Sequence, residues 1–312
     1  TILIFCVEYK NIFDHLLMRN YHYILVCVCM ILLPGVSGCS SEHNIQQTVQ
    51  DGRMCFRLVH PSAATSRVNE SGFEVSDSIG LFITEGEKPL QPSSNYVNNE
   101  LLIYNGSTWE PKTPVYWNEG TYTAYAYYPY TTPIHSVDNY PLSVMSDQRM
   151  EENGVGNYEL SDFLWAKSAN LSATSSPVSM TFRHCMSRLD IRLVKGEDYE
   201  GDLPEDAVVY IHNTVTSATA DLNAGIVTKN PYASAQTVTA HDLGNHRYSA
   251  ILVPQRLDNR VPLVEVVMKG VSYLVESKFL FKQGVCHTLT LVISKNPEQI
   301  KIEIGGELEN WN

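Results

Sequence analysis

The chain carries few residue patterns that could support catalysis or metal binding. His241 and His246, in the segment HDLGNH, come nearest to a metal-ligand pair, but a spacing of five residues in a turn gives the two rings no shared strand face. Glu151 and Glu152 could join a glycosidase pair only through an accident of tertiary structure. The sequence has no phosphate-binding loop, zinc-protease motif, nucleophile elbow or dinucleotide fingerprint. We therefore expect a protein that is not an enzyme and uses no metal or cofactor.

An aromatic-rich stretch at 116–130, YWNEGTYTAYAYYPY, offers a different chemistry. Flat rings stack on sugar faces and tyrosine hydroxyls donate hydrogen bonds, so Trp109, Trp117, Tyr125 and Tyr127 are candidate sugar contacts. However, the alanines that alternate with the rings are typical of a strand packed in a sandwich core. The core interpretation is favoured.

The N-terminal region predicts an exported lipoprotein. An apolar run at 24–36 follows Met18 and Arg19, and its thirteen residues are too few to span a bilayer. The run ends in VSGC, which resembles a bacterial lipobox with Cys39 as the lipidated residue. We expect residues 1–38 to be removed, with 1–17 lying upstream of the true start, and the polar CSSEH to act as a tether to the outer membrane.

Composition and charge narrow the class of protein further. With 22 Lys and Arg against 34 Asp and Glu, the net charge of −12 argues against nucleic acid as a partner. The 18 Tyr, 15 Pro and 18 Gly suit a β-rich extracellular chain. Beyond the leader, Cys55, Cys185 and Cys286 sit in apolar strand patterns, so we expect buried thiols, although the sequence leaves their pairing open.

Period-two alternation of apolar residues is the dominant pattern and predicts an all-β fold. The expected strands cover 53–59, 79–84, 100–104, 115–128, 178–183, 188–193, 207–212, 248–253, 262–268, 271–281, 286–293 and 300–304. Polar stretches at 131–161, 167–177 and 196–206 are expected to be irregular. Because the chain changes character near residue 187, we predict an N-terminal β-sandwich within 39–186 and a C-terminal one within 187–312.

Several segments together resemble a known family. In chain order they are SRVNESGFEVSDSIGLFIT (66–84), GSTWEPKTPVYW (106–117), AYAYYPY (124–130), DFLWAKS (162–168), VSMTFRHCMSRLDIRL (178–193), FLFKQGVCHTLTLVI (279–293) and IKIEIGGELENW (300–311). Following a lipobox, they resemble the fimbrillins of Bacteroidales, which are subunits of type V pili. The resemblance implies two tandem transthyretin-like β-sandwiches, outer-membrane export to the cell surface, assembly with other fimbrial subunits, and adhesion to surface glycans or proteins.

The same resemblance implies an assembly mechanism. In fimbrillins, an Arg-directed protease removes the first strand, and a strand from a neighbouring subunit fills the groove. The removable strand here would be 53–59, whose inward residues are Met54, Phe56 and Leu58. Arg67 matches the cleaved arginine and stands in a polar loop suited to proteolysis.

The sequence leaves open the position of the subunit in a fibre and one alternative function. Only GGELENWN follows Ile304, so donation of a C-terminal strand is doubtful unless 300–304 itself is the donor. A tip, accessory or surface-retained subunit is therefore favoured over a stalk subunit. The alternative function is a surface lipoprotein that binds carbohydrate and never polymerises. Buried rings with 53–59 at a sheet edge would support assembly, whereas exposed rings would support sugar binding.

Overall fold

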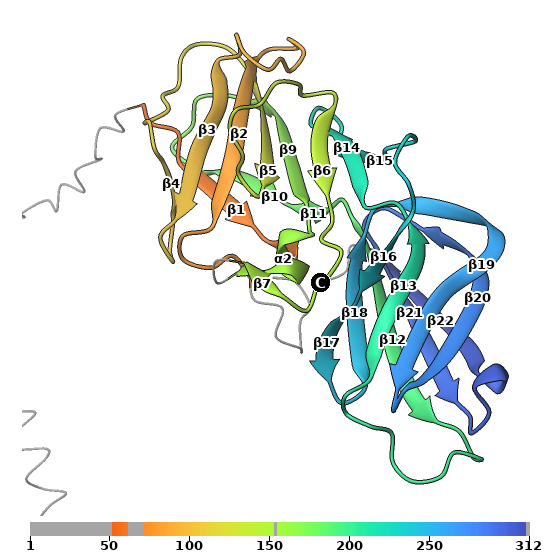
Figure 1. Ribbon diagram of the computed structural model, residues 1–312. Helices are drawn as coiled ribbons and strands as arrows, with labels where there is room; N and C mark the ends of the chain where they lie inside the picture. Colours follow the sequence, from red (N-terminus) through yellow and green to blue (C-terminus); the bar gives the residue numbers. More distant parts are fainter. Residues whose placement is uncertain (1–51, 62–71, 153–154, 310–312) are drawn as a thin grey trace, which may run out of the picture. The chain divides into compact units, whose positions relative to one another are not determined.

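The computed structural model describes residues 52–61, 72–152 and 155–309, and all of these residues belong to one compact unit (Figure 1). The described part is almost entirely β-structure, with the strands β1 to β22, the four-residue helix α2 (Asn157–Leu160) and the 3₁₀ turn η2 (Pro297–Gln299). The predicted all-β class is therefore confirmed.

The first half of the chain forms an eight-stranded sheet in the order β10-β1-β4-β3-β2-β5-β9-β11. Its strands are β1 (Phe56–Val59), β2 (Ser78–Glu85), β3 (Val97–Tyr104), β4 (Trp109–Pro111), β5 (Tyr122–Tyr128), β9 (Leu164–Leu171), β10 (Val178–Thr181) and β11 (Arg183–His184). Figure 1 shows β1 and β10 behind β2, β3 and β5.

This sheet encloses a core of its own. One face of β2 supplies Ile79, Leu81 and Ile83, each 0–1% exposed, and the alternation of apolar residues along the strand sets that face. Residues of β1, β5, β9 and β10 pack against the same side. Apolar burial between these strands therefore stabilises the sheet around its core.

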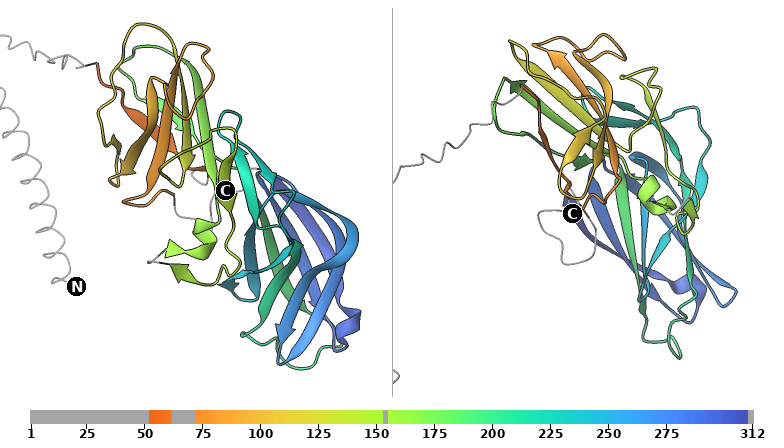
Figure 2. Two further views of the ribbon diagram at one scale, coloured as in Figure 1. Left: turned by 45° about the horizontal axis from the view of Figure 1, so that its top comes forward. Right: turned by 90° about the vertical axis from the view of Figure 1, so that its left-hand side faces the viewer.

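Two further sheets face each other in the second half (Figure 2). One has the order β17-β18-β12-β21-β22 and the other the order β16-β13-β19-β20. The strands are β12 (Ser187–Lys195), β13 (Val208–Thr214), β16 (Gln236–Thr239), β17 (His241–Gly244), β18 (Arg247–Leu252), β19 (Gln255–Met268), β20 (Val271–Phe281), β21 (Val285–Ile293) and β22 (Lys301–Glu309). Side chains from both sheets, including Ile191, Leu291 and Val264, share one buried cluster.

The stretch 131–161, expected to be irregular, is partly regular. It contains β6 (Tyr140–Ser143), β7 (Glu151–Glu152), β8 (Val155–Gly156) and α2. β6 pairs with β14 (Ser217–Asp221), which pairs with β15 (Ile226–Lys229). The prediction missed these elements because β6 contains a proline and its partner lies far away in the sequence.

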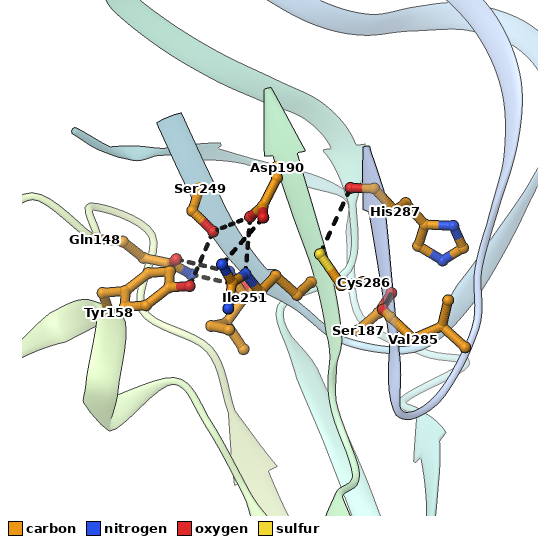
Figure 3. A network of polar contacts seen from close by, with 10 residues as sticks. Gln148, Tyr158, Ser187, Asp190, Ser249, Ile251, Val285, Cys286 and His287 are labelled. Carbon is orange, nitrogen blue, oxygen red and sulfur yellow. Dashed lines mark hydrogen bonds and ion pairs between the residues drawn. The ribbon is translucent and has the colours of Figure 1, made fainter. Parts of the chain in front are cut away.

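Residues after β6 are bound to the second half by buried polar contacts (Figure 3). The Gln148 side chain, 0% exposed, accepts a hydrogen bond from the Ile251 amide at 2.9 Å and donates one to the Ile251 carbonyl at 2.7 Å. Nearby, the Tyr158 hydroxyl lies 2.9 Å from Ser249 Oγ, and Ser249 donates to Asp190 at 2.7 Å. A glutamine that satisfies both groups of one residue acts like a strand neighbour.

Other sequence expectations are corrected in detail. The strand expected at 115–128 begins only at Tyr122. The stretch 167–177, expected to be irregular, contains the end of β9, and the last strand extends beyond Ile304 to Glu309. Of the three thiols, all free, Cys185 and Cys286 are buried as expected, but Cys55 is exposed.

The division of the chain into sandwiches at 39–186 and 187–312 stays a prediction. The eight-stranded sheet uses residues 56–184 and the two facing sheets use residues 187–309, but the three-stranded sheet combines β6 with β14 and β15.

Candidate functional site

The site singled out by the sequence is β1, which lies between two strands. On one side it runs parallel to β10, with Phe56 opposite Val178 and Leu58 opposite Met180. Backbone hydrogen bonds extend this pairing at both ends, from the Val178 amide to the Cys55 carbonyl at 2.8 Å and from the Phe182 amide to the Val59 carbonyl at 2.9 Å. β1 is thus joined along its whole length to β10.

The other side of β1 is held less completely. Only Phe56 is paired with β4, opposite Trp109. Just before the strand, the Met54 amide donates to the Val115 carbonyl at 2.8 Å and the Trp117 amide donates to the Gly52 carbonyl at 2.6 Å. A position of 53–59 at a sheet edge would have supported assembly, but β1 has neighbours on both sides, so this condition is not met. Removal of β1 would leave a gap bordered by two strands.

Three side chains of this segment point into the core. Met54, Phe56 and Leu58 are 3%, 6% and 8% exposed and belong to the cluster inside the eight-stranded sheet. Cys55 and Arg57, which alternate with them, are exposed. The structure therefore places the inward set as the alternation predicts, with three adjoining apolar sites in the core. Removal of the strand stays a prediction.

Aromatic rings surround the end of β1. The His60 ring lies 4.9 Å from Phe73 and 6.0 Å from His184, measured between ring centroids. His184 Nδ1 is 2.6 Å from Asp162 Oδ2, and this pair is largely buried. Arg67, a few residues further on, and Cys39 both lie outside the described residues, so their predicted roles stay predictions.

The pKa of His60 is lowered from 6.5 to about 4, mainly by burial and then by the neighbouring His184, while Asp162 opposes the shift. Because the unfolded chain binds this proton more readily, acidification from pH 6.5 towards pH 4 should cost up to about 3 kcal/mol of folding stability. We expect His60→Phe to reduce this loss. Urea unfolding of both proteins at pH 7.5 and pH 4.5 would measure it, and an equal loss in both would contradict the assignment.

The candidate sugar-binding rings do not form an exposed platform. Trp109, Tyr125 and Tyr127 are 5%, 5% and 1% exposed, and Trp117 is partly buried. The Tyr127 hydroxyl lies 2.7 Å from Asn99 Oδ1 and 2.9 Å from the Thr131 carbonyl oxygen. The Lys167 ammonium covers the Tyr125 ring at 4.8 Å. Rings closed off in this way offer no face to a sugar.

A pocket of about 380 Å³ lies instead between the end of β2 and the loop that leads to β3. Its lining includes Gln91, Asn95 and Tyr96. Asn95 folds the loop by accepting a hydrogen bond from the Gln91 amide at 3.0 Å and donating to the Gln91 carbonyl at 2.7 Å. This pocket could not be predicted from the residue pattern because it depends on how the loop closes over the strand.

The last strand, β22, is an edge strand with few buried side chains. Among the described strands it pairs with β21 alone, with an irregularity between His287 and Leu289. Ile302 is partly buried, whereas Ile304 is 69% exposed. Gly305 and Gly306 follow, and a side chain at Gly305 would meet the Thr288 hydroxyl and carbonyl. Over residues 301–307 of β22, Ile302 and Ile304 are therefore the apolar side chains, and neither is fully buried.

The remaining candidate ligands are not assembled. The His241 ring stacks on Tyr158 at 5.1 Å between centroids, and His246 Nε2 lies 3.4 Å from a Glu205 carboxylate oxygen. Across the described ranges, no three His, Cys, Asp or Glu side chains gather where they could hold a metal ion. None of the helices in those ranges is long and apolar enough to span a membrane.

Comparisons with known proteins agree on one group. Residues 66–311 match the profile of a family described as fimbrillin-like. A Bacteroides uniformis protein provisionally named fimbrium subunit Fim1C is 22% identical over 309 residues, covering 94% of this chain and 96% of the relative.

Two solved structures share the fold. A provisionally described cell adhesion protein from Bacteroides uniformis aligns with a TM-score of 0.65 and 18% identity, covering 84% of this chain and 99% of its own. A second, from Bacteroides ovatus, aligns with a TM-score of 0.66 and 17% identity, covering 83% and 97%.

Proposed function

The chain belongs to the fimbrillin-like family, as the resemblance in its sequence predicted, and on this premise we propose that it is an adhesive fimbrial subunit that assembles by β-strand addition. An Arg-directed protease cuts after Arg67 and releases β1. A strand from a neighbouring subunit then takes its place between β10 and β4, and no cofactor takes part. The related Fim1C, named as a fimbrium subunit, supports this role.

The observation that carries the proposal is the setting of β1. A four-residue strand places Phe56 and Leu58 in the core, yet only one of its residues pairs with β4. Once β1 is removed, its side-chain sites and the free backbone groups of β10 remain open, and burying them again favours uptake of another strand. An incoming strand with alternate apolar residues satisfies both needs.

Two further features complete the proposal. Lipid on Cys39 anchors the precursor to the outer membrane, from which it reaches the cell surface. A donor strand needs alternate apolar side chains, and in β22 Ile304 is exposed and two glycines follow it. The composition of β22 therefore favours a tip or accessory position over repeated donation along a stalk.

A surface lipoprotein that binds carbohydrate without polymerising is the second candidate. The observation in its favour is the pocket beside β2, where amide groups and the Tyr96 ring suit a hydroxyl-rich ligand. The buried aromatic rings described above no longer favour it. Failure of the purified protein to assemble after cleavage would favour carbohydrate binding over assembly.

Limited trypsin treatment tests the assembly mechanism. We expect intact mass to show cutting after Arg67, followed by SDS-resistant oligomers that never form from Arg67→Ala. Arg57→Ala is the matched control, because Arg57 is exposed on β1 and its loss should leave both cutting and assembly unchanged. A chain that stays uncut, or is cut at residue 67 without associating, would contradict the mechanism.

A further inference from the structure

The strand β20 (Val271–Phe281) forms an open edge of its four-stranded sheet. β19 pairs with it from Met268 opposite Val271 to Gln255 opposite Phe281, and no strand of the described chain lies on its other side. The η2 turn approaches β20 but does not pair with it. An edge of eleven residues is long for an exposed strand, and the backbone amides and carbonyls on its open side can accept a further strand.

The outward face of β20 is partly apolar. Leu274 and Leu280 are 44% and 45% exposed, and between them stand one acidic and one basic residue, Glu276 and Lys278. On the inward face, Tyr273, Val275 and Phe281 are buried while Phe279 is only partly buried. Side chains of the strand thus alternate between core and solvent. On the solvent side, two oppositely charged residues stand between two leucines.

This order makes β20 complementary to itself. When two copies align antiparallel with Ser277 opposite Ser277, each Glu276 faces the other copy's Lys278 and each Leu274 faces the other copy's Leu280. Residues directly opposite in an antiparallel pair share one face, so both contacts form on the solvent side. Shifting the centre by one residue would place Glu276 opposite Glu276 or Lys278 opposite Lys278.

We propose that two copies of this chain pair edge to edge through β20, with Ser277 at the two-fold axis. The pairing forms two Glu276–Lys278 ion pairs and two Leu274–Leu280 contacts, and it extends the sheet across both subunits. Glu276 also lies 3.6 Å from Arg260 of its own chain, but both side chains are exposed and such a pair is weak. This contact uses neither β1 nor Arg67, so it is independent of strand exchange.

Sedimentation velocity of the full-length protein in mild detergent tests the pairing. All proteins carry Arg67→Ala, so that strand exchange cannot contribute. We expect a monomer–dimer equilibrium, and we expect Glu276→Lys or Lys278→Glu alone to weaken dimerisation by about tenfold or more, because each places like charges opposite each other. The double variant E276K/K278E restores both attractive pairs and should dimerise like the parent.

Mixing the two single variants is the sharpest arm of the experiment. A Glu276→Lys chain presents two lysines and a Lys278→Glu chain presents two glutamates, so a heterodimer should form where neither variant dimerises alone. A parent that remains monomeric at about 200 µM, where a weak specific contact would be populated, contradicts the proposal. Single variants that dimerise as the parent does, or a mixture that gives no heterodimer, also contradict it.

Discussion

Replacing Phe56 with alanine should lower the free energy of unfolding of the uncut protein by about 3–5 kcal/mol. Phe56 is 6% exposed and packs in the core of the eight-stranded sheet opposite Val178 and Trp109. Once β1 has been released and replaced by a neighbour's strand, residue 56 is no longer part of the fold. The same substitution should therefore leave the SDS resistance of the assembled oligomers unchanged.

Met180→Ala provides the matched control for this difference. Met180 is 1% exposed on β10 and stays in the fold before and after strand exchange, so its loss should weaken both forms by about 2–5 kcal/mol. Urea unfolding measures the uncut protein, and thermal dissociation in SDS measures the oligomers. If Phe56→Ala prevents folding, Phe56→Leu allows the same comparison with a smaller loss of folding stability. Equal effects of the Phe56 substitution on both forms would contradict release of β1.

Replacing Gln148 with methionine should destabilise the protein by about 2–4 kcal/mol, because methionine keeps the length of the side chain but cannot pair with the Ile251 amide and carbonyl. Both groups would stay buried without partners. Figure 3 shows the glutamine facing Ile251 beside the Tyr158–Ser249 contact.

Arg149→Ala is the control for Gln148, since its side chain is exposed and pairs only with Asp147 in the described contacts, which predicts a loss below about 1 kcal/mol. Chemical unfolding followed by circular dichroism compares the two variants. A Gln148→Met protein within about 0.5 kcal/mol of the parent would show that the bidentate contact contributes nothing, contrary to the penalty for unpaired buried groups.

Local alternation was enough to predict most of the strands and the inward face of the candidate site. The set Ile191, Leu193 and Leu189 is buried as its period of two requires, and so is the set Met54, Phe56 and Leu58. The short strands β14 to β17 were missed because small and polar residues such as those of Ser217–Asp221 carry a weak apolar signal.

The neighbours of β1 were beyond the reach of the sequence. Periodicity shows which side of a strand is buried, but it does not show that Phe56 pairs with Val178, far away along the chain. For the same reason the sequence could not show that β1 lies between two strands while β20 lies at an edge. The aromatic residues show a second limit of prediction from sequence, because a sugar-binding platform and a packed core have the same composition. The burial of Tyr127 and Trp109, seen only in the structure, identifies these rings as core.

Hydrogen exchange at the Val178 and Phe182 amides tests the central claim most directly, because both donate to carbonyls of the β1 segment. The account predicts strong protection in the uncut precursor, loss of protection in cleaved monomers freed of β1, and renewed protection in the assembled oligomers. Protection that stays the same through cleavage and assembly would show that β1 never leaves its place, and would contradict strand exchange at this site.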